Sequence, residues 1–403
     1  MGDFYQNGII TNFHNLRSRD TEELERELTS FSRKRPMTLV LPSLYSELEG
    51  DALPRIVEIL KDVPYLEEIV IGLDRASEKQ FRQAKEFFSV LPQQHRILWQ
   101  DGPNLRAIDK KLSEHDLSPT HEGKGRNVWY CYGYVLASGR SQSVAMHDCD
   151  ILTYDRSMLA RLMYPVANPA FNYEFCKGYY FRCADGELKG RASRLLVTPL
   201  LRTLKKIFGY NDYLEYLDSY RYPLSGEFSM RTDLLNDIRI PSDWGLEIGV
   251  LSEVKHNFET RRICQVDIAD RYDHKHQPLS RESIDNGLSK MTLDISKALF
   301  RKLATCGIVF DKGKFRTIKA TYYRIALDFI ETYYNDALMN GLSLDRHAEE
   351  EAVELFAANI LEAGKQFLDH PLETPFIPSW NRVSSALPNV LEHIYEAVEK
   401  DNE

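Results

Sequence analysis

The sequence is poor in cysteine and has no long apolar run. Its six cysteines among 403 residues form no Cys-x-x-Cys pair and no regular spacing, so we expect reduced thiols in a cytoplasmic protein. The first ten residues, MGDFYQNGII, lack a basic start and an apolar core, which predicts that there is no signal peptide. No segment approaches the roughly 20 apolar residues that span a bilayer, so we expect no membrane partner.

Positive charge is not in excess either. The net charge of −9 at pH 7 argues against general nucleic-acid binding and leaves room only for a local basic pocket. Internal repeats and low-complexity segments are also absent. The chain does have enough apolar sequence for a full core, because 43% of its residues are hydrophobic and 28% are charged. This balance predicts one large domain with an extension.

Strand-like apolar runs alternate with helical patterns up to about residue 155. The runs MTLVLPSL, LEEIVIGLD, HRILWQD and SVAMHDCD are separated by segments with helical spacing of apolar residues, which predicts an α/β fold with a mostly parallel sheet covered on both faces. We expect the first strand to stop at Pro42, because proline cannot donate to a strand ladder. In such sheets ligands bind beyond the carboxyl ends of the strands. The residues at those ends are Pro42, Asp74, Asp148 and Asp150.

The pattern changes after residue 155 and again near residue 285. Short strands and loops fill residues 170–282, and long amphipathic stretches such as KATYYRIALDFIETYYNDALM follow. We therefore expect an N-terminal helical arm at 1–36, a central domain at 37–282 with parts 37–155 and 156–282, and a helical C-terminal extension at 283–403. Five aromatic residues in the extension cover more than one helical face and must be buried, either within this chain or against another, and we predict a homodimer; they are Tyr322, Tyr323, Phe329, Tyr333 and Tyr334.

Three short segments carry groups that suit a metal ion and a phosphate. Asp148 and Asp150 end a buried strand, where a pair of carboxylates suits Mg²⁺ or Mn²⁺ held also by substrate phosphates; the alternative is a solvated turn. Lys124 stands between two glycines before a helix, which suits an anion, again with a solvated turn as the alternative. In RYDHKHQPL, His274 or His276 could offer an imidazole to the metal or lie on the surface.

A group of cations precedes an apolar helix in LKGRASRLLVTPLL. Lys189, Arg191 and Arg194 stand where the helix dipole favours anions, so they indicate a phosphate or carboxylate site; the alternative is a solvated basic face. Two further segments, PLSGEF and SDWGLEIGVL, are unremarkable alone. They contain Gly226 and Glu227, and Asp243 and Glu247.

Taken in this order, the segments resemble glycosyltransferase family 81, the glucosyl-3-phosphoglycerate synthases and their mannosyl relatives. The resemblance covers roughly residues 37–282 and rests on the GKG-helix, the DxD strand, GRASRLLVTPLL, PLSGEF, WGLEIGVL and HxxxPL. It implies an α/β, GT-A type fold with a mixed, mostly parallel sheet and a metal-dependent transfer with retention. It also implies a nucleotide-sugar donor bound by residues 37–155 and 3-phosphoglycerate as the acceptor bound by residues 156–282.

The resemblance also implies roles for individual residues. The metal ligands would be Asp150, His274 and Asp148, and the catalytic residues Glu247, Asp150 and Lys124. The acceptor would meet Arg191, Ser193 and Lys189. The donor would meet Pro42, Ser43, Leu44, Glu47, Asp74, Lys124, Asp148, Cys149, Gly226 and Glu227. The sequence departs from the family twice: Tyr45-Ser46-Glu47 replaces Asn-Glu-Glu, and Arg-x-Ser replaces Arg-x-Thr, which keeps the hydroxyl.

The function expected from these features is transfer of glucose from UDP-glucose to the 2-hydroxyl of 3-phosphoglycerate. No carboxylate stands out as a covalent nucleophile, and the family implies that the leaving phosphate helps to deprotonate the acceptor. One alternative is mannosyl transfer from GDP-mannose to 3-phosphoglycerate or glycerate. A sugar-1-phosphate nucleotidyltransferase is another, although LPSLYSELEGD lacks its Gly-rich loop. A non-catalytic nucleotide-sugar-binding scaffold is the third, and Asp150, His274 and Arg191 argue against it.

Overall fold

A mixed β-sheet forms the centre of the protein. The computed structural model describes residues 8–119, 121–274, 287–371 and 376–403, and within them nine strands form one sheet in the order β1-β9-β6-β8-β5-β2-β3-β4, with β7 beside β6. β8 is antiparallel to β5 and β6, and the other neighbours on this path are parallel. The mostly parallel α/β sheet predicted from the sequence is confirmed. The strands are β1 Thr11–Phe13, β2 Met37–Leu44, β3 Leu66–Asp74, β4 Gln94–Trp99, β5 Ser143–Met146, β6 Phe175–Ala184, β7 Glu187–Leu188, β8 Phe228–Arg231 and β9 Ile263–Tyr272.

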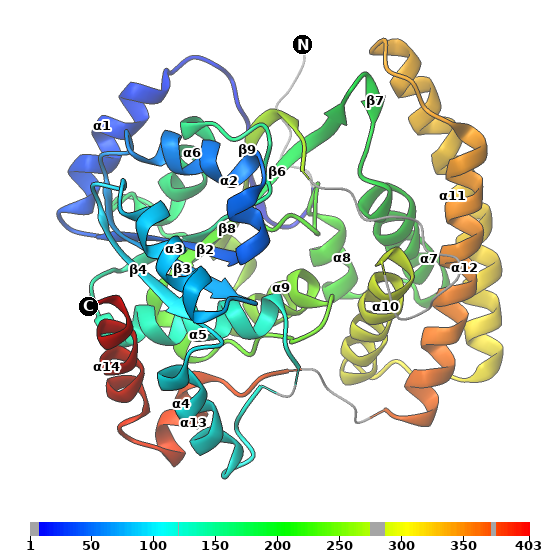
Figure 1. Ribbon diagram of the computed structural model, residues 1–403. Helices are drawn as coiled ribbons and strands as arrows, with labels where there is room; N and C mark the ends of the chain where they lie inside the picture. The colour runs from blue at the N-terminus through cyan, green and yellow to red at the C-terminus, as the bar shows by residue number, and fades with distance from the viewer. Residues whose placement is uncertain (1–7, 120, 275–286, 372–375) are drawn as a thin grey trace.

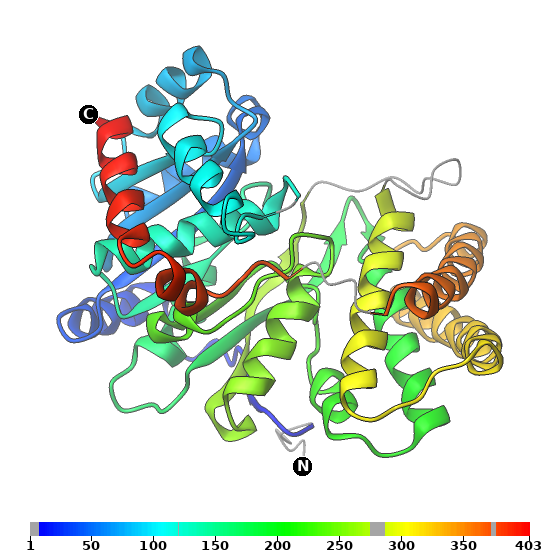
Figure 2. The ribbon, with the colours of Figure 1, turned by 90° about the horizontal axis from the view of Figure 1, so that it is seen from below.

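The helices that follow these strands cover both faces of the sheet (Figures 1 and 2). Alternate residues of β2 and β3 enter two separate cores, with Val40 and Val70 on one face and Leu39 and Ile69 on the other. Burial on both faces explains why the middles of these strands, residues 39–41 and 69–71, are continuously apolar. One core packs against α4 Pro103–Ser113 and α5 Lys124–Ser138, and the other against α1 Thr21–Ser32, α2 Ala52–Leu60, α3 Glu78–Phe88 and α6 Arg156–Ala167.

The first long strand does not stop at Pro42, so that expectation is wrong. β2 continues to Leu44, and residues 42–44 pair in register with residues 72–74 of β3. The other neighbour, β5, ends opposite Val40. Beyond that point β2 has a strand on one side only, so the missing N–H of Pro42 does not interrupt a ladder on its other side.

A helical layer stands beside the second half of the sheet, at the right of Figure 1. It contains a π-helical turn at Ala192–Val197, α7 Thr198–Phe208, α8 Asp212–Asp218, α10 Gly287–Thr305, α11 Lys312–Met339 and α12 Arg346–Asp369, while α9 Leu246–Asn257 lies nearer the sheet. Tyr322 is fully buried within the chain, whereas Tyr323 is 37% exposed. None of the described helices is long and apolar enough to cross a membrane.

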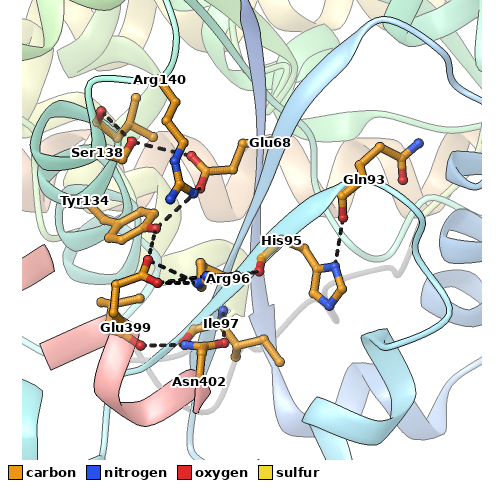
Figure 3. A network of polar contacts seen from close by, with 12 residues as sticks. Glu68, Gln93, His95, Arg96, Ile97, Tyr134, Ser138, Arg140, Glu399 and Asn402 are labelled. Atoms are coloured by element: carbon orange, nitrogen blue, oxygen red, sulfur yellow. Dashed lines mark hydrogen bonds and ion pairs between the residues drawn. The ribbon is translucent and has the colours of Figure 1, made fainter. Parts of the chain in front are cut away.

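The end of the chain returns to the first half of the sheet. After α13 Trp380–Ala386, helix α14 Val390–Asn402 lies beside α4, α5 and the edge strand β4. The Asn402 amide pairs with both backbone groups of Ile97, at 3.0 and 2.9 Å, and Arg96 donates to Glu399 (Figure 3). These contacts cover an edge that could otherwise pair with another chain. The expected division at residues 36 and 282 stays a prediction; β1 and α14 show that both ends of the chain also contact the sheet.

Candidate active site

The acidic pair and His274 meet at the carboxyl end of β5. Asp148 and Asp150 follow that strand directly, and His274 follows the end of β9. An isolated antiparallel bridge between Ile151 and His274 brings the two segments together. Asp150 Oδ2 then lies 3.5 Å from His274 Nδ1, and each side chain is little more than a quarter exposed.

These two side chains fit a metal ion better than they fit each other. A separation of 3.5 Å is too long for a strong hydrogen bond, and His274 Nδ1 is buried without a hydrogen-bond partner among the described residues. Two ligands of one ion with bonds of about 2.1 Å lie roughly 3.0–3.4 Å apart. Within the described part of the chain no group of three or more His, Cys, Asp or Glu side chains could hold a metal ion, so water or a bound anion would have to supply further ligands. His276 lies outside the described residues.

The charge on Asp150 is stabilised by its neighbours. Burial by itself opposes ionisation, but His274 and the ammonium of Lys124 outweigh it and lower the pKa of Asp150 below its ordinary value. A carboxylate that stays ionised suits a divalent cation.

Lys124 stands at the start of α5 and joins two carboxylates. Its Nζ lies 2.6 Å from Asp148 Oδ1 and 3.3 Å from Glu247 Oε1, at the first turn of α9. Burial opposes the charge, but Asp148 and Glu247 together raise the pKa of Lys124 above its ordinary value. The expected GKG-helix is therefore confirmed as a local structure, and its lysine is charged beside the acidic pair.

Gly226 allows Asp148 to lie against the loop before β8. A Cβ added at Gly226 would meet Asp148 Oδ2 at 2.3 Å, so no larger residue fits while Asp148 keeps this position. The next residue, Glu227, is fully buried and accepts hydrogen bonds from Tyr272 at 2.8 Å and from Ser225 at 3.0 Å. Burial, followed by the charge of Asp148, raises the pKa of Glu227.

The segment expected to meet the nucleoside lies at the adjoining end of β2. Ser43 is buried and donates to the Leu44 carbonyl at 2.9 Å, and the neighbouring Cys149 is also buried. Pro42 and Leu44 are half-buried. Because β2 lies between β3 and β5, these residues adjoin the acidic pair, as the sequence predicts.

Glu47 and Asp74 lie farther along the same edge. Glu47 belongs to a short 3₁₀ turn at Tyr45–Glu49 and is half-buried. Asp74 pairs in register with Leu44, is 5% exposed, and accepts the backbone N–H of Arg75 at 3.0 Å. Burial and then the charge of Asp101 raise the pKa of Asp74, so its carboxylate is less suited to a cation than that of Asp150.

The basic segment after β7 has partners within the protein. Arg191 Nε donates to Glu349 Oε1 at 2.6 Å, Arg194 donates to the same carboxylate at 2.8 Å, and Lys189 pairs with Glu187. The cluster is therefore not simply a solvated basic face, because partners within the protein hold these cations; the anion site indicated by the sequence stays a prediction. Ser193 is 4% exposed, and its hydroxyl has no hydrogen-bond partner among the described residues.

A row of tyrosines connects this basic segment with the acidic pair. A Cβ at Gly190 would lie 3.4 Å from the hydroxyl of Tyr222. The ring centroids of Tyr222 and Tyr180 are 4.8 Å apart, and those of the stacked rings of Tyr180 and Tyr272 are 3.6 Å apart. The ring centroid of Tyr272 lies 5.6 Å from that of His274. The residues before Arg191 thus lie near the residues around His274.

Two functional candidates were not predicted from the sequence. Lys177 of β6 is 1% exposed, donates to the Ser225 carbonyl, and lies over the Phe228 ring at 5.0 Å. Burial lowers its pKa to about 8, despite nearby Glu247 and other carboxylates. A lysine inside the apolar run FCKGYYF could have indicated Lys177. The second candidate is Glu349, the partner of Arg191 and Arg194, and no local sequence signal marks it.

The sequence is similar to proteins named glucosyl-3-phosphoglycerate synthase. No family model matches the sequence. The chain is 47% identical over 402 residues to the glucosyl-3-phosphoglycerate synthase of Persephonella marina, covering 100% of this chain and 99% of that protein. It is 38% identical over 400 residues to the enzyme of the same name from Methanococcoides burtonii, covering 98% and 97%.

A solved structure confirms the fold. Glucosyl-3-phosphoglycerate synthase from Mycobacterium tuberculosis, in complex with Mn²⁺, UDP-glucose and phosphoglyceric acid, superposes with a TM-score of 0.53 at 20% identity, covering 75% of this chain and 89% of that one. The α/β fold of GT-A type expected from the sequence is therefore confirmed.

Proposed function

The chain belongs to the glucosyl-3-phosphoglycerate synthase family of glycosyltransferases, and from this we propose that it transfers glucose from UDP-glucose to the 2-hydroxyl of 3-phosphoglycerate with retention. The observation that carries the proposal is the meeting of Asp150 and His274 with Lys124 and Asp148 at the ends of the strands. Family membership favours glycosyl transfer over sugar-1-phosphate nucleotidyl transfer and over a non-catalytic scaffold.

The donor is proposed to lie along the ends of β2 and β5. Pro42, Ser43 and Leu44 would contact the uridine, with Glu47, Asp74 and Cys149 nearby. Lys124 would meet the diphosphate, where an ammonium stabilises the negative charge that develops as the sugar–phosphate bond breaks. The mycobacterial relative binds UDP-glucose in its crystal structure, which supports this choice of donor.

Asp150 and His274 are proposed to hold a divalent ion, Mg²⁺ or Mn²⁺, with Asp148 beside it. When bound, such an ion supplies positive charge to the diphosphate of the donor. Asp148 also keeps Lys124 in place through the contact at 2.6 Å. Gly226 lies against the Asp148 carboxylate, and Gly226 and Glu227 would lie next to the donor.

The acceptor is proposed to bind at Arg191, Ser193 and Lys189. Arg191 offers a guanidinium to the phosphate or carboxylate of the acceptor. The Ser193 hydroxyl has no hydrogen-bond partner among the described residues, and the acceptor could be that partner. Glu247 contacts Lys124, and Glu227 accepts hydrogen bonds from Tyr272 and Ser225. This supports transfer without a covalent intermediate, in which the leaving phosphate takes the acceptor proton and Glu247 contacts the sugar.

One assay tests the donor and the acceptor together. The purified protein is incubated with UDP-, GDP- and ADP-sugars, Mg²⁺, and either 3-phosphoglycerate or glycerate, and NMR identifies the product and its anomeric configuration. The proposal expects an α-glucoside from UDP-glucose and 3-phosphoglycerate. A preference for GDP-mannose would identify a mannosyl transferase, and a preference for glycerate would refute the acceptor assignment.

We also propose that the protein is cytoplasmic and forms a homodimer. Each chain is proposed to consist of an N-terminal arm up to residue 36, a central domain up to residue 282 and a C-terminal extension. The aromatic residues of α11 that are exposed or half-buried, Tyr323 and Tyr334 among them, support a contact between copies. Light scattering at micromolar concentration tests it, and a monomeric mass would refute it.

A further inference from the structure

The C-terminal helical layer contributes one buried carboxylate to the segment that carries the proposed acceptor arginine. Glu349, in the first turn of α12, is 1% exposed. Its Oε1 accepts the Nε–H of Arg191 at 2.6 Å, and its Oε2 accepts an N–H of Arg194 at 2.8 Å. A single carboxylate therefore binds the guanidinium groups of two arginines that are three positions apart in the sequence.

Arg191 and Arg194 differ in what else they contact. The Arg194 side chain is 8% exposed, donates also to the Lys189 carbonyl, and lies over the Tyr333 ring at 5.0 Å. The Arg191 side chain is 35% exposed, and among the described residues Glu349 is the only hydrogen-bond partner of this side chain. Because Nε is engaged, the two terminal amino groups of Arg191 remain available as an end-on pair for an anion.

The backbone next to Arg191 is held by the same helical layer. Residues Ala192–Val197 form a π-helical turn, a conformation that is rare and frequent at functional sites. The buried hydroxyl of Tyr322, in α11, donates to the Leu195 carbonyl of this turn. Both the side chain and the backbone of the acceptor segment thus depend on α11 and α12, which stand beside it in Figure 1.

We propose that Glu349 is a positioning residue for the acceptor, holding Arg191 so that its two terminal amino groups face the phosphate or carboxylate of phosphoglycerate. The proposal rests on the function proposed above, in which Arg191 contacts the acceptor. Charge by itself acts in the opposite direction, because a carboxylate beside the pocket repels an anionic acceptor. The benefit of Glu349 to binding therefore comes from the orientation that it imposes on Arg191.

The opposing signs make Glu349→Gln a decisive variant. Glutamine keeps the size and one acceptor oxygen but removes the charge, so an effect of charge alone would lower the Michaelis constant for 3-phosphoglycerate. Loss of orientation should instead raise that constant about tenfold, the lower end of what one charge-assisted hydrogen bond contributes. The constant for UDP-glucose should change less than about twofold. Glu350→Gln, an exposed position on the same helix, is the matched control and should change neither constant.

Further variants separate failure of this proposal from failure of the proposed function. Glu349→Asp keeps the charge but shortens the reach, and it should also raise the constant; it serves as the second variant if Glu349→Gln does not fold by circular dichroism. In an Arg191→Ala background, Glu349→Gln should add less than about twofold, because its effect passes through Arg191. If Arg191→Ala raises the constant and Glu349→Gln leaves or lowers it, the positioning role is wrong. If neither variant changes it, the acceptor assignment of Arg191 is wrong.

Discussion

Replacement of Gly226 by alanine tests how closely the acidic pair must be placed. The added Cβ would lie 2.3 Å from Asp148 Oδ2 and 2.7 Å from its Cγ, whereas ordinary contacts begin at 3.4 Å. The carboxylate must therefore move by the difference between 3.4 and 2.3 Å, about 1.1 Å. Gly226 does not have a positive φ, so the alanine backbone itself is unstrained and the clash is the whole perturbation.

The displacement should affect activity far more than stability. Asp148 is a short side chain that is 25% exposed and can rotate, so we expect the free energy of unfolding to fall by about 1 kcal/mol, the low end for an overpacked site. Rotation breaks the contact of Asp148 with Lys124, at 2.6 Å, and displaces both groups from the place proposed above for the donor diphosphate. Misplacement by about 1 Å in a catalytic centre typically reduces turnover about 100-fold, or roughly 2.7 kcal/mol at the transition state.

The assay compares initial rates at saturating donor and acceptor with thermal unfolding of the same preparations. Gly50→Ala is the matched control, because its Cβ would meet only the Glu47 carbonyl oxygen at 3.4 Å, and it should keep wild-type activity. A Gly226→Ala protein that folds normally and turns over within threefold of the wild type would refute the reasoning. It would mean that Asp148 does not need this position for the reaction.

Three other predictions follow from the site. Asp150→Asn and His274→Ala should each nearly abolish turnover while circular dichroism stays unchanged, and EDTA should do the same to the wild type; full activity in EDTA would contradict a metal-dependent reaction. Arg191→Ala should raise the Michaelis constant for 3-phosphoglycerate about 10- to 100-fold, which corresponds to one charge-assisted contact, and leave that for UDP-glucose nearly unchanged in steady-state kinetics. Burial lowers the pKa of Lys177 to about 8 from 10.5, so the unfolded chain binds more protons between these values and stability should rise with pH across that window. Lys177→Met should flatten the rise in urea unfolding measured at several pH values, and an unchanged slope would show that Lys177 is not the group responsible.

Much of the fold was predictable because its signals are local. The middles of the runs MTLVLPSL and LEEIVIGLD, residues 39–41 and 69–71, are buried on both faces of the sheet and are continuously apolar. Ser77 begins α3 with a capping box that it forms with Gln80, three residues later in the chain. The end of β2 was less predictable. Whether Pro42 interrupts a strand depends on where β5 ends, and that is a property of the neighbouring strand.

Some residues of the candidate site were likewise predictable from local sequence, and others were not. Asp148, Asp150 and Lys124 were predictable because each stands at the end of a strand or the start of a helix within its own segment. The partners of these residues were predictable only through the family resemblance, since His274 and Glu247 come from distant segments. Glu349 carries no local pattern that distinguishes it from a surface helix glutamate, whereas the position of Lys177 within an apolar strand run is a local signal that the prediction did not use.

The sequence by itself determined the order of strands and helices, and with it the edge at which the charged groups collect. Apolar periodicity and capping depend on neighbours a few positions away, so these features can be predicted from short stretches of sequence. Only the tertiary structure decided which charges meet, because contacts such as Asp150 with His274 and Arg191 with Glu349 join residues far apart in the chain. These pairings depend on strand order and helix packing, so the side chain that orients the proposed acceptor arginine is one that the sequence alone does not single out.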